Sequence, residues 1–461
     1  MINVTLICDH KWRDLPGLVW LQCVLQRSTG WNAGVVSKIG LPEHLALFPP
    51  SIIVIPSSNP PWLEHAAEWR KAGVLVVLLP TEGRPTYGKT LEWSVSSRDG
   101  SQADLVLLWS EKMAEIWQGC AAPNALAHGV TGPTRFDFYR EPLRQMLPTA
   151  GEFAGRLGID DGVPMVSWAT AFPHAKFHGG GEEWQVNDWV RMGLGNAGLT
   201  EDDMRELIRG EFQSRETSWS TLRACAEALP ELAFCLKPHP FEDFAWCEST
   251  LAGWREAGLS NVYLVKGFYI WDLLNACSLH IHRACTTGTE AWLLDTPTLE
   301  LGFVHDHSRI LEAGTAEPGA SRDAESAEDV VDTPGALIER IKYYLRGGPV
   351  DPELQTRRTQ YCGKWFYQVD GNATQRAVES IIAESEQHEI LQHRFWAKKN
   401  LRTRLSSMAK SRLGLPYDEP VMETRGEPGH DVDARGHWDR VICQRDVLEW
   451  DTRLKRVAHD G

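Results

Sequence analysis

The sequence lacks long hydrophobic runs, paired cysteines and an excess of positive charge. Its longest apolar stretches, such as residues 74–79, have the length of strands and are too short to cross a membrane. None of the ten cysteines belongs to a C-x-x-C pair, which is typical of a reducing cytoplasm. The net charge of −15 argues against a general nucleic-acid binder, because neutralising phosphates needs a basic surface. Residues 1–8 have the pattern of a strand rather than a secretory leader, and we therefore expect a cytoplasmic protein.

Two phosphate-binding motifs are also missing. No Walker loop and no G-x-G-x-x-G follows a predicted strand, which argues against a kinase-type phosphate site and against a nicotinamide dinucleotide. His280 and His282, and the run from His305 to His307, have the chemistry of metal ligands, but no Cys/His framework with zinc spacing accompanies them. We therefore expect neither a bound metal nor a cofactor.

Strand-like and helix-like segments alternate through most of the chain, which predicts α/β domains with parallel sheets covered on both faces. A polar, charged segment separates two series of alternating strands and helices, and the two series are of similar length. We predict Rossmann-like domains at 1–150 and 151–372 that face a central cleft, followed by a C-terminal helical appendage at 373–461. The predicted strands cover residues 2–8, 51–56, 74–79 and 103–109 in the first domain, and 163–168, 232–236, 261–265, 279–282 and 298–301 in the second.

Three segments do not fit this alternation. Residues 178–209 form a polar, helical insertion that we expect to close over the cleft, and residues 314–335 have the composition of a loop. Residues 391–413 carry seven basic residues and no acid, with apolar residues at roughly helical spacing. Such a helix suits an anionic membrane surface, and the alternative is docking on an acidic face of the same protein.

The strand predicted at 232–236 ends in Lys237, Pro238, His239 and Pro240. Because proline cannot continue a sheet ladder, Lys237 and His239 are expected at the carboxyl end of a parallel strand, where open α/β sheets bind ligands. A cation and an imidazole at that place suit a phosphate. The alternative is a capped strand with a solvated lysine and a hydrogen-bonded histidine.

Small hydroxyl residues follow the strand predicted at 279–282. Thr286 and Thr287 come just before a helix predicted near residues 289–294, whose first turn contains Glu290. Hydroxyls and backbone N–H groups at a helix start suit a phosphate or a ribose. A threonine-capped helix with an acid in its first turn explains the same residues without a ligand.

Charged residues also follow predicted strands of the first domain. Glu82 comes after the strand at 74–79 and before Gly83, which suits a general base or nucleophile facing the cleft; a simple turn acid is the alternative. The remaining cleft candidates are Asp9, Arg13, Asp14, Arg135 and Asp137. The alternatives are that Asp14 caps a helix and that Arg135 and Asp137 form a structural pair.

The order of these motifs resembles that of bacterial surface-polysaccharide glycosyltransferases of the GT-B fold. The resemblance covers residues 1–385 and is strongest to surface carbohydrate biosynthesis proteins, with kinship to capsule Kdo transferases and GT-B sialyltransferases. The motifs that carry it are Gly-Pro-x-Arg-Phe-Asp at 132–137, Lys-Pro-His-Pro at 237–240, Thr-Thr-x-x-Glu-Ala at 286–291 and Leu-x-x-Pro at 294–297.

The resemblance implies roles for individual residues. It implies that His239 contacts the donor phosphate, that Thr286 and Thr287 bind the nucleotide phosphate, and that Glu82 is the catalytic carboxylate. The sialyltransferase motif usually has two acids before the glycine, whereas this chain has Thr81 and then Glu82. The alternative acids are Asp9, Asp14 and Asp137.

The activity implied is transfer of a sugar from a CMP-activated donor, such as CMP-Kdo or a related acidic sugar, to a surface-polysaccharide acceptor. The nucleotide-sugar is then expected as a substrate, and the acceptor as a glycan or a lipid-linked acceptor. The basic segment at 391–413 is the part expected to contact a membrane surface. Three alternatives remain: a transferase of glycerol phosphate from CDP-glycerol, a nucleotide-sugar epimerase, and a noncatalytic assembly factor that kept the fold.

Overall fold

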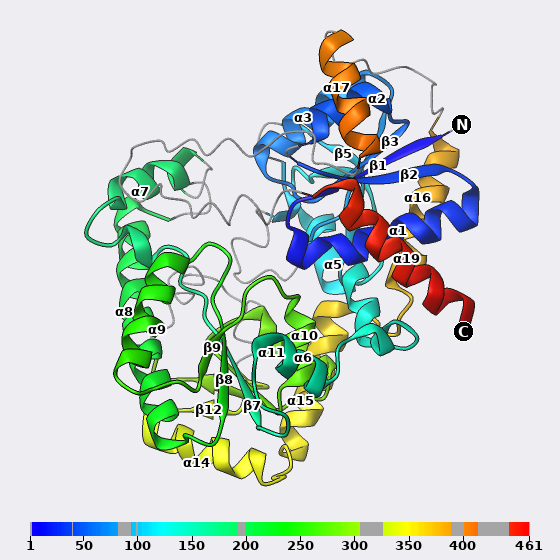
Figure 1. Cartoon of the computed structure of the whole chain (residues 1–461). Helices are drawn as coiled ribbons and strands as arrows, with labels where there is room; N and C mark the ends of the chain where they lie inside the picture. Colours follow the sequence, from blue (N-terminus) through cyan, green and yellow to red (C-terminus); the bar gives the residue numbers. More distant parts are fainter. Residues whose placement is uncertain are drawn as a thin grey trace.

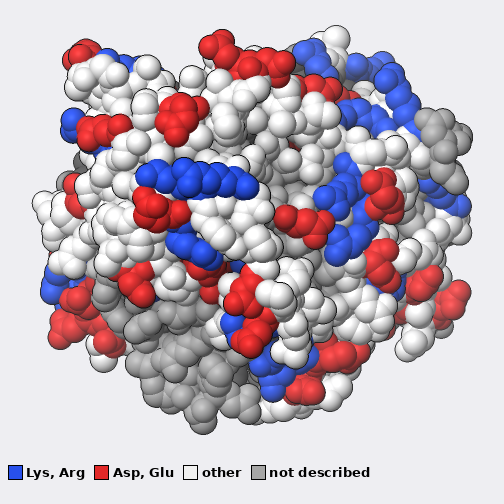
Figure 2. All heavy atoms as spheres, turned by 90° about the horizontal axis from the view of Figure 1, so that it is seen from below, with Lys and Arg blue, Asp and Glu red and all other residues white. Residues whose placement is uncertain are grey.

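The structure is a computed structural model that describes residues 2–38, 40–81, 94–97, 100–191, 195, 199–304, 326–388, 401–413 and 442–460. It has two lobes, each built on a parallel sheet with helices on both faces (Figure 1). Among the helices so described, none combines the length and apolar character needed to span a membrane. On the face seen in Figure 2, acidic and basic side chains are intermingled.

The first lobe contains a six-stranded sheet in the order β2-β1-β3-β4-β5-β6, with every neighbouring pair parallel. Every residue of β3, β4 and β5 is buried, which explains why these strands are continuous apolar runs. The strands are β1 (Asn3–Cys8), β2 (Asn32–Ser37), β3 (Ile52–Ile55), β4 (Leu75–Leu78), β5 (Ala103–Leu108) and β6 (Ala125–Val130).

The second lobe contains a parallel six-stranded sheet in the order β12-β11-β10-β7-β8-β9. Its strand order reverses at β7 and β10, which places the ends of β7, β8 and β10 near the point where open α/β sheets bind ligands. The strands are β7 (Met165–Ala169), β8 (Ala233–Lys237), β9 (Val262–Leu264), β10 (Leu279–His282), β11 (Thr298–Leu301) and β12 (Val330–Val331).

Helices connect the strands and cover the sheets. The first lobe has α1 (Lys11–Thr29), α2 (Leu41–Leu47), α3 (Pro60–Lys71) and α5 (Glu111–Gly119). The connection to the second lobe has the short helices η1 (Thr134–Tyr139) and η2 (Leu143–Met146). The second lobe has α6 (Ala150–Leu157), η3 (Ala175–Phe177), α7 (Glu182–Arg191), α8 (Glu201–Ala228), α9 (Phe244–Glu256), α10 (Ile270–Ala276), α11 (Thr286–Leu293), α14 (Pro334–Leu345) and α15 (Pro352–Phe366).

The predicted insertion at 178–209 is the start of a longer helical unit. Helix α8 begins at Glu201, where Thr200 and Asp203 form a capping box, and continues to Ala228, well beyond the end of the predicted insertion. Helix α7 packs against α8 around a small apolar cluster of its own. The predicted loop at 314–335 contains β12, and its residues 314–325 lie outside the described part of the chain.

The C-terminal helices predicted as an appendage are present and pack on the first lobe. Helix α16 (Ala373–Gln387) and helix α19 (Gln444–Asp460) both contact α1, and their apolar residues belong to the same core as β1 to β5 (Figure 1). Asp137 of η1 holds the start of α16, because its carboxylate accepts the backbone N–H groups of Ala373 and Thr374, each at 2.9 Å. The chain thus returns to the first lobe after completing the second.

Helix α17 (Leu401–Arg412) is the described part of the basic segment predicted at 391–413. It lies beside α2 at the outer end of the first lobe (Figure 1). Leu405, Met408 and Leu413 are exposed there, by 57%, 42% and 65%. Residues 391–400 lie outside the described part of the chain.

Candidate functional site

A cavity of about 350 Å³ lies between the two lobes, where the carboxyl ends of strands from both sheets meet. The first lobe contributes aromatic and basic side chains, and the second contributes the ends of β7 and β8 and the start of α11. The lining residues include His10, Trp12, Arg13, Trp109 and Arg135 from the first lobe, and Thr170, Lys237, His239, Trp271, Thr286, Thr287 and Glu290 from the second. Segments far apart in the sequence therefore share one cavity.

Lys237 and His239 enter this cavity from the end of β8. Lys237 is the last residue of the strand and is half-buried. The backbone N–H of Phe241 donates to His239 Nδ1 at 3.2 Å, so the neutral imidazole carries its proton on Nε2. The local backbone thereby fixes the tautomer that can donate a hydrogen bond to a ligand.

A buried carboxylate supports the loop that carries His239. Glu242 Oε1 accepts the backbone N–H of His239 at 3.0 Å and the hydroxyl of Thr170 at 2.8 Å. Burial raises the pKa of Glu242 to about 7, although these hydrogen bonds act in the opposite direction. Glu242 therefore ties the end of β8 to the segment after β7. Nothing in the sequence pattern pointed to Glu242, because it lies two residues beyond the Lys-Pro-His-Pro motif in an ordinary polar turn.

Thr286 and Thr287 form the first turn of α11, which follows β10. The side chain of Thr287 is held from behind: its Oγ1 lies 2.8 Å from His280 Nε2, and His280 Nδ1 lies 2.8 Å from Ser167 Oγ. Complete burial lowers the pKa of His280 well below its usual value, so this ring is neutral. His280 thus supports the start of α11 from within the sheet.

Two histidine motifs have the chemistry of metal ligands, and the structure describes only the one on β10. The rings of His280 and His282 stack at 5.3 Å on one face of β10, as strand alternation requires. His282 Nε2 lies 3.1 Å from the buried carboxylate of Glu328. Within the described ranges, no group of three or more His, Cys, Asp or Glu side chains is placed to hold a metal ion. The run from His305 to His307 lies outside those ranges.

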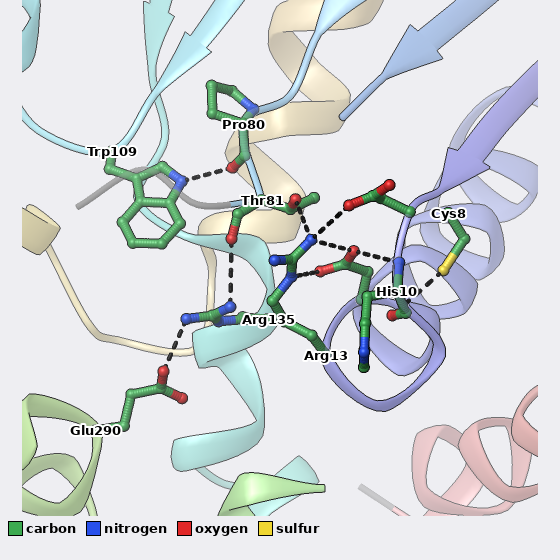
Figure 3. Close-up of polar contacts among 10 residues, drawn as sticks. Cys8, His10, Arg13, Pro80, Thr81, Trp109, Arg135 and Glu290 are labelled. Carbon is green, nitrogen blue, oxygen red and sulfur yellow. Dashed lines mark hydrogen bonds and ion pairs between the residues drawn. The ribbon is translucent and has the colours of Figure 1, made fainter. Parts of the chain in front are cut away.

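Glu290 joins the two lobes across the cavity. Its carboxylate accepts Arg135 Nη2 at 2.8 Å (Figure 3). It also accepts the hydroxyl of Tyr139, and both partners come from η1. Burial, followed by the charge of Glu290, raises the pKa of Tyr139 well above its usual value, so the phenol keeps its proton and donates it. Arg135 and Glu290 were predicted as site residues, whereas Tyr139, two residues after the motif at 132–137, was not.

Arg13 organises the first-lobe side of the cavity. Its guanidinium bonds Asp14 Oδ1 at 2.6 Å, Asp9 Oδ2 at 3.2 Å and the hydroxyl of Thr81 at 3.0 Å (Figure 3). Asp14 also accepts the backbone N–H of His10 at 3.0 Å, which fixes the first turn of α1. The acids at positions 9 and 14 are therefore both paired with Arg13.

The other two predicted acids are placed differently. Asp137 lies 1% exposed under the start of α16 and forms no pair with Arg135, which turns to Glu290 instead. Glu82 lies outside the described residues. The last described residue before it, Thr81, is bonded to a residue that lines the cavity, because its backbone oxygen accepts Arg135 Nη1 at 3.3 Å.

Comparison with known proteins adds structural neighbours. No protein-family model matches the sequence, and no curated protein matches it. A variant of the wall teichoic acid polymerase TagF, soaked with CDPG, aligns with a TM-score of 0.54 at 12% identity, covering 84% of this chain and 90% of its own. The UDP complex of S. aureus MnaA aligns with a TM-score of 0.50 at 12% identity, covering 84% and 97%. The UDP-GlcNAc 2-epimerase of Methanocaldococcus jannaschii aligns with a TM-score of 0.47 at 11% identity, covering 83% and 100%.

The chain has the GT-B fold. Two six-stranded parallel sheets facing one cavity, with the last helices returning to the first lobe, agree with the alignment to TagF over most of both chains. At this level of identity the likeness concerns the architecture. Function has to be argued from the residues of the cavity.

Proposed function

We propose that the protein is a glycosyltransferase of cell-surface glycan synthesis that takes a sugar from a CMP-activated donor, such as CMP-Kdo or a related acidic sugar. One observation carries the proposal. Lys237, His239 and the first turn of α11 line the same cavity, although they come from separate segments. A cation, an imidazole N–H and a helix start are three groups that stabilise phosphate charge.

The chemistry follows from that placement. Transfer breaks the bond between the anomeric carbon and the phosphate oxygen of the donor, and the departing CMP gathers negative charge that Lys237 and His239 stabilise. Glu82 is proposed as the carboxylate that takes the proton of the acceptor hydroxyl or attacks the sugar first. The nucleotide-sugar is a substrate, and no cofactor or metal is part of the proposal.

A second candidate function is transfer of glycerol phosphate from CDP-glycerol. Lys237, His239 and the start of α11 suit the diphosphate of CDP-glycerol as well, and one aligned protein of the same fold is a TagF variant soaked with CDPG. The reaction would break a P–O bond of the diphosphate rather than a sugar C–O bond. Incubating the protein with CMP-Kdo, CDP-glycerol or UDP-GlcNAc and identifying the products separates sugar transfer, glycerol-phosphate transfer and epimerisation.

Nucleotide binding provides the first test. A ligand that binds only the folded state stabilises it, by about 2.7 kcal/mol at roughly 100 times its Kd. Because the proposed donor is CMP-activated, CMP and CDP are expected to raise the melting temperature more than UDP and GDP do. A thermal-shift measurement with equal concentrations of the four nucleotides checks this. Equal shifts with all four would reject the cytidine assignment.

We also propose that α17 holds the enzyme at the cytoplasmic face of the membrane. Its basic residues include Lys410 and Arg412, and Leu405 and Met408 are exposed beside them. Basic residues near an anionic surface contribute about 1 kcal/mol each, and exposed apolar side chains can enter the interface.

Vesicle binding tests this location. The protein is expected to sediment with vesicles that contain phosphatidylglycerol and not with pure phosphatidylcholine, and Leu405→Glu with Met408→Glu is expected to remove most of the bound fraction. Leu448→Glu on α19, where the leucine is 54% exposed, is the matched control. Equal sedimentation of all variants, or binding without anionic lipid, would contradict the proposal.

A further inference from the structure

A second and larger cavity, of about 750 Å³, lies beside the one between the lobes. Trp12 lines both cavities, so they adjoin at this side chain. The walls come from the start of α1, from η2 and α6, from the segment before α10, and from α19. Both lobes and the returning C-terminal helix therefore build this space together.

The inner wall of this cavity is aromatic. Trp12 and Tyr269 meet edge to face with ring centres 5.2 Å apart, and Trp450 Nε1 donates to the Tyr269 hydroxyl at 2.9 Å. Tyr269 and Trp450 are nearly buried, whereas Trp12 is half-buried. Aromatic rings with a polar tip present an apolar face at a wet boundary, which suits the C–H faces of sugar rings.

Charged groups of both signs surround the aromatic wall. Lys11 pairs with Asp446 at 2.8 Å, and Arg156 lies 3.8 Å from Asp272. Three basic side chains face four acidic ones in all, so the cavity has no excess of positive charge for a second nucleotide. The basic residues are Lys11, Arg156 and Arg453, and the acidic residues are Glu152, Asp272, Asp446 and Glu449.

We propose that this cavity binds uncharged sugar units of the acceptor glycan, behind the end that reacts, and that the glycan passes Trp12 into the cavity between the lobes. The inference rests on the proposed glycosyl transfer. Carboxylates accept and guanidinium groups donate hydrogen bonds to sugar hydroxyls, and the nearby rings cover the sugar faces. The volume is within the range of small-molecule sites and is large enough for more than one sugar ring.

A third cavity, of about 330 Å³ beside Arg13, is less suited to a chain. Its lining includes Val106, Leu108 and Met113, which are core residues, so its inner end is closed. The larger cavity instead has half-exposed Arg156 and exposed Glu449 at its edge, which leaves a route to solvent for the rest of a polymer. A glycan that continues beyond the enzyme therefore fits the larger cavity.

Gly155 of α6 offers a way to fill this cavity without touching the other one. It lines the larger cavity only, and a Cβ added at this position meets no atom within 4 Å. Gly155→Phe places a ring in the space, and losing a glycine within a helix does not lower helix stability. Gly253→Phe on α9 is the matched control, because that exposed helical glycine also has no atom within 4 Å of an added Cβ and lines none of these cavities. Glu449→Arg on α19 narrows the opening from the opposite wall.

The experiment uses the full-length protein and an array of linear tetrasaccharides, neutral and acidic, with titration of the neutral members that bind. Wild type and Gly253→Phe are expected to bind at least one neutral member, while Gly155→Phe and Glu449→Arg bind it about tenfold more weakly. All variants keep the melting-temperature increase with CMP. Absence of neutral-glycan binding by wild type, preference for acidic members, or equal binding by Gly155→Phe would each overturn the proposal. If CMP does not raise the melting temperature of the wild type, the proposed transfer is rejected instead, and the glycan binding of the variants can still be interpreted by itself.

Discussion

Replacing His239 by alanine is expected to abolish the increase in melting temperature caused by CMP or CDP and to lower sugar transfer by about 10²- to 10³-fold. The imidazole lines the cavity between the lobes, and the Phe241 N–H bond to Nδ1 leaves the proton on Nε2 as a donor. Removing one preorganised donor to a departing anion costs a rate factor of this order. Thermal-shift titration and a transfer assay with CMP-Kdo measure the two effects.

The controls separate a ligand contact from a change in folding. His239→Gln keeps an N–H donor of similar reach and is expected to recover part of the nucleotide effect, which a purely structural role would not predict. His65→Ala on α3 removes an exposed imidazole and should change nothing. An unchanged CMP effect in His239→Ala, with the melting temperature of the free protein also unchanged, would show that the end of β8 does not touch the nucleotide.

The sequence predicted the strands whose residues are buried on both sides. Strands β3, β4 and β5 are uninterrupted apolar runs, and such runs can be recognised as buried strands from the sequence alone. Strands β2, β6 and β12 were missed. All three are at sheet edges, where burial is incomplete, and β12 has only two residues. An edge strand of this kind has neither a full apolar run nor clean alternation.

The candidate site was predictable only where its residues follow their own strands. The two prolines after the predicted strand indicated that Lys237 and His239 lie at a strand end, and the structure has them at the end of β8. The bond between Tyr139 and Glu290 joins residues 151 positions apart, and local patterns carry no information about such a pair. The same holds for Asp137, which holds a helix start 236 residues further along the chain.

Replacing Glu290 by alanine is expected to lower the free energy of unfolding by about 3–5 kcal/mol, even without nucleotide. The Glu290 side chain is 4% exposed and the Arg135 side chain 13% exposed, so truncation leaves the guanidinium with an unpaired, largely buried charge. Tyr139 loses its carboxylate partner in the same step. Urea denaturation of the free protein measures the loss. Glu115→Ala in the exposed pair with Lys112 is the control and should cost less than about 1 kcal/mol.

A double-mutant cycle shows whether the loss comes from this pair. Arg135→Ala combined with Glu290→Ala should cost less than the sum of the single substitutions, because the second removes a charge that the first has left unpaired. Additive losses would contradict the pairing. The cycle also separates two roles of Glu290: Arg135→Ala leaves its carboxylate in place beside Thr286 and Thr287. If CMP still raises the melting temperature of Arg135→Ala but not of Glu290→Ala, the carboxylate acts in nucleotide binding as well as in joining the lobes.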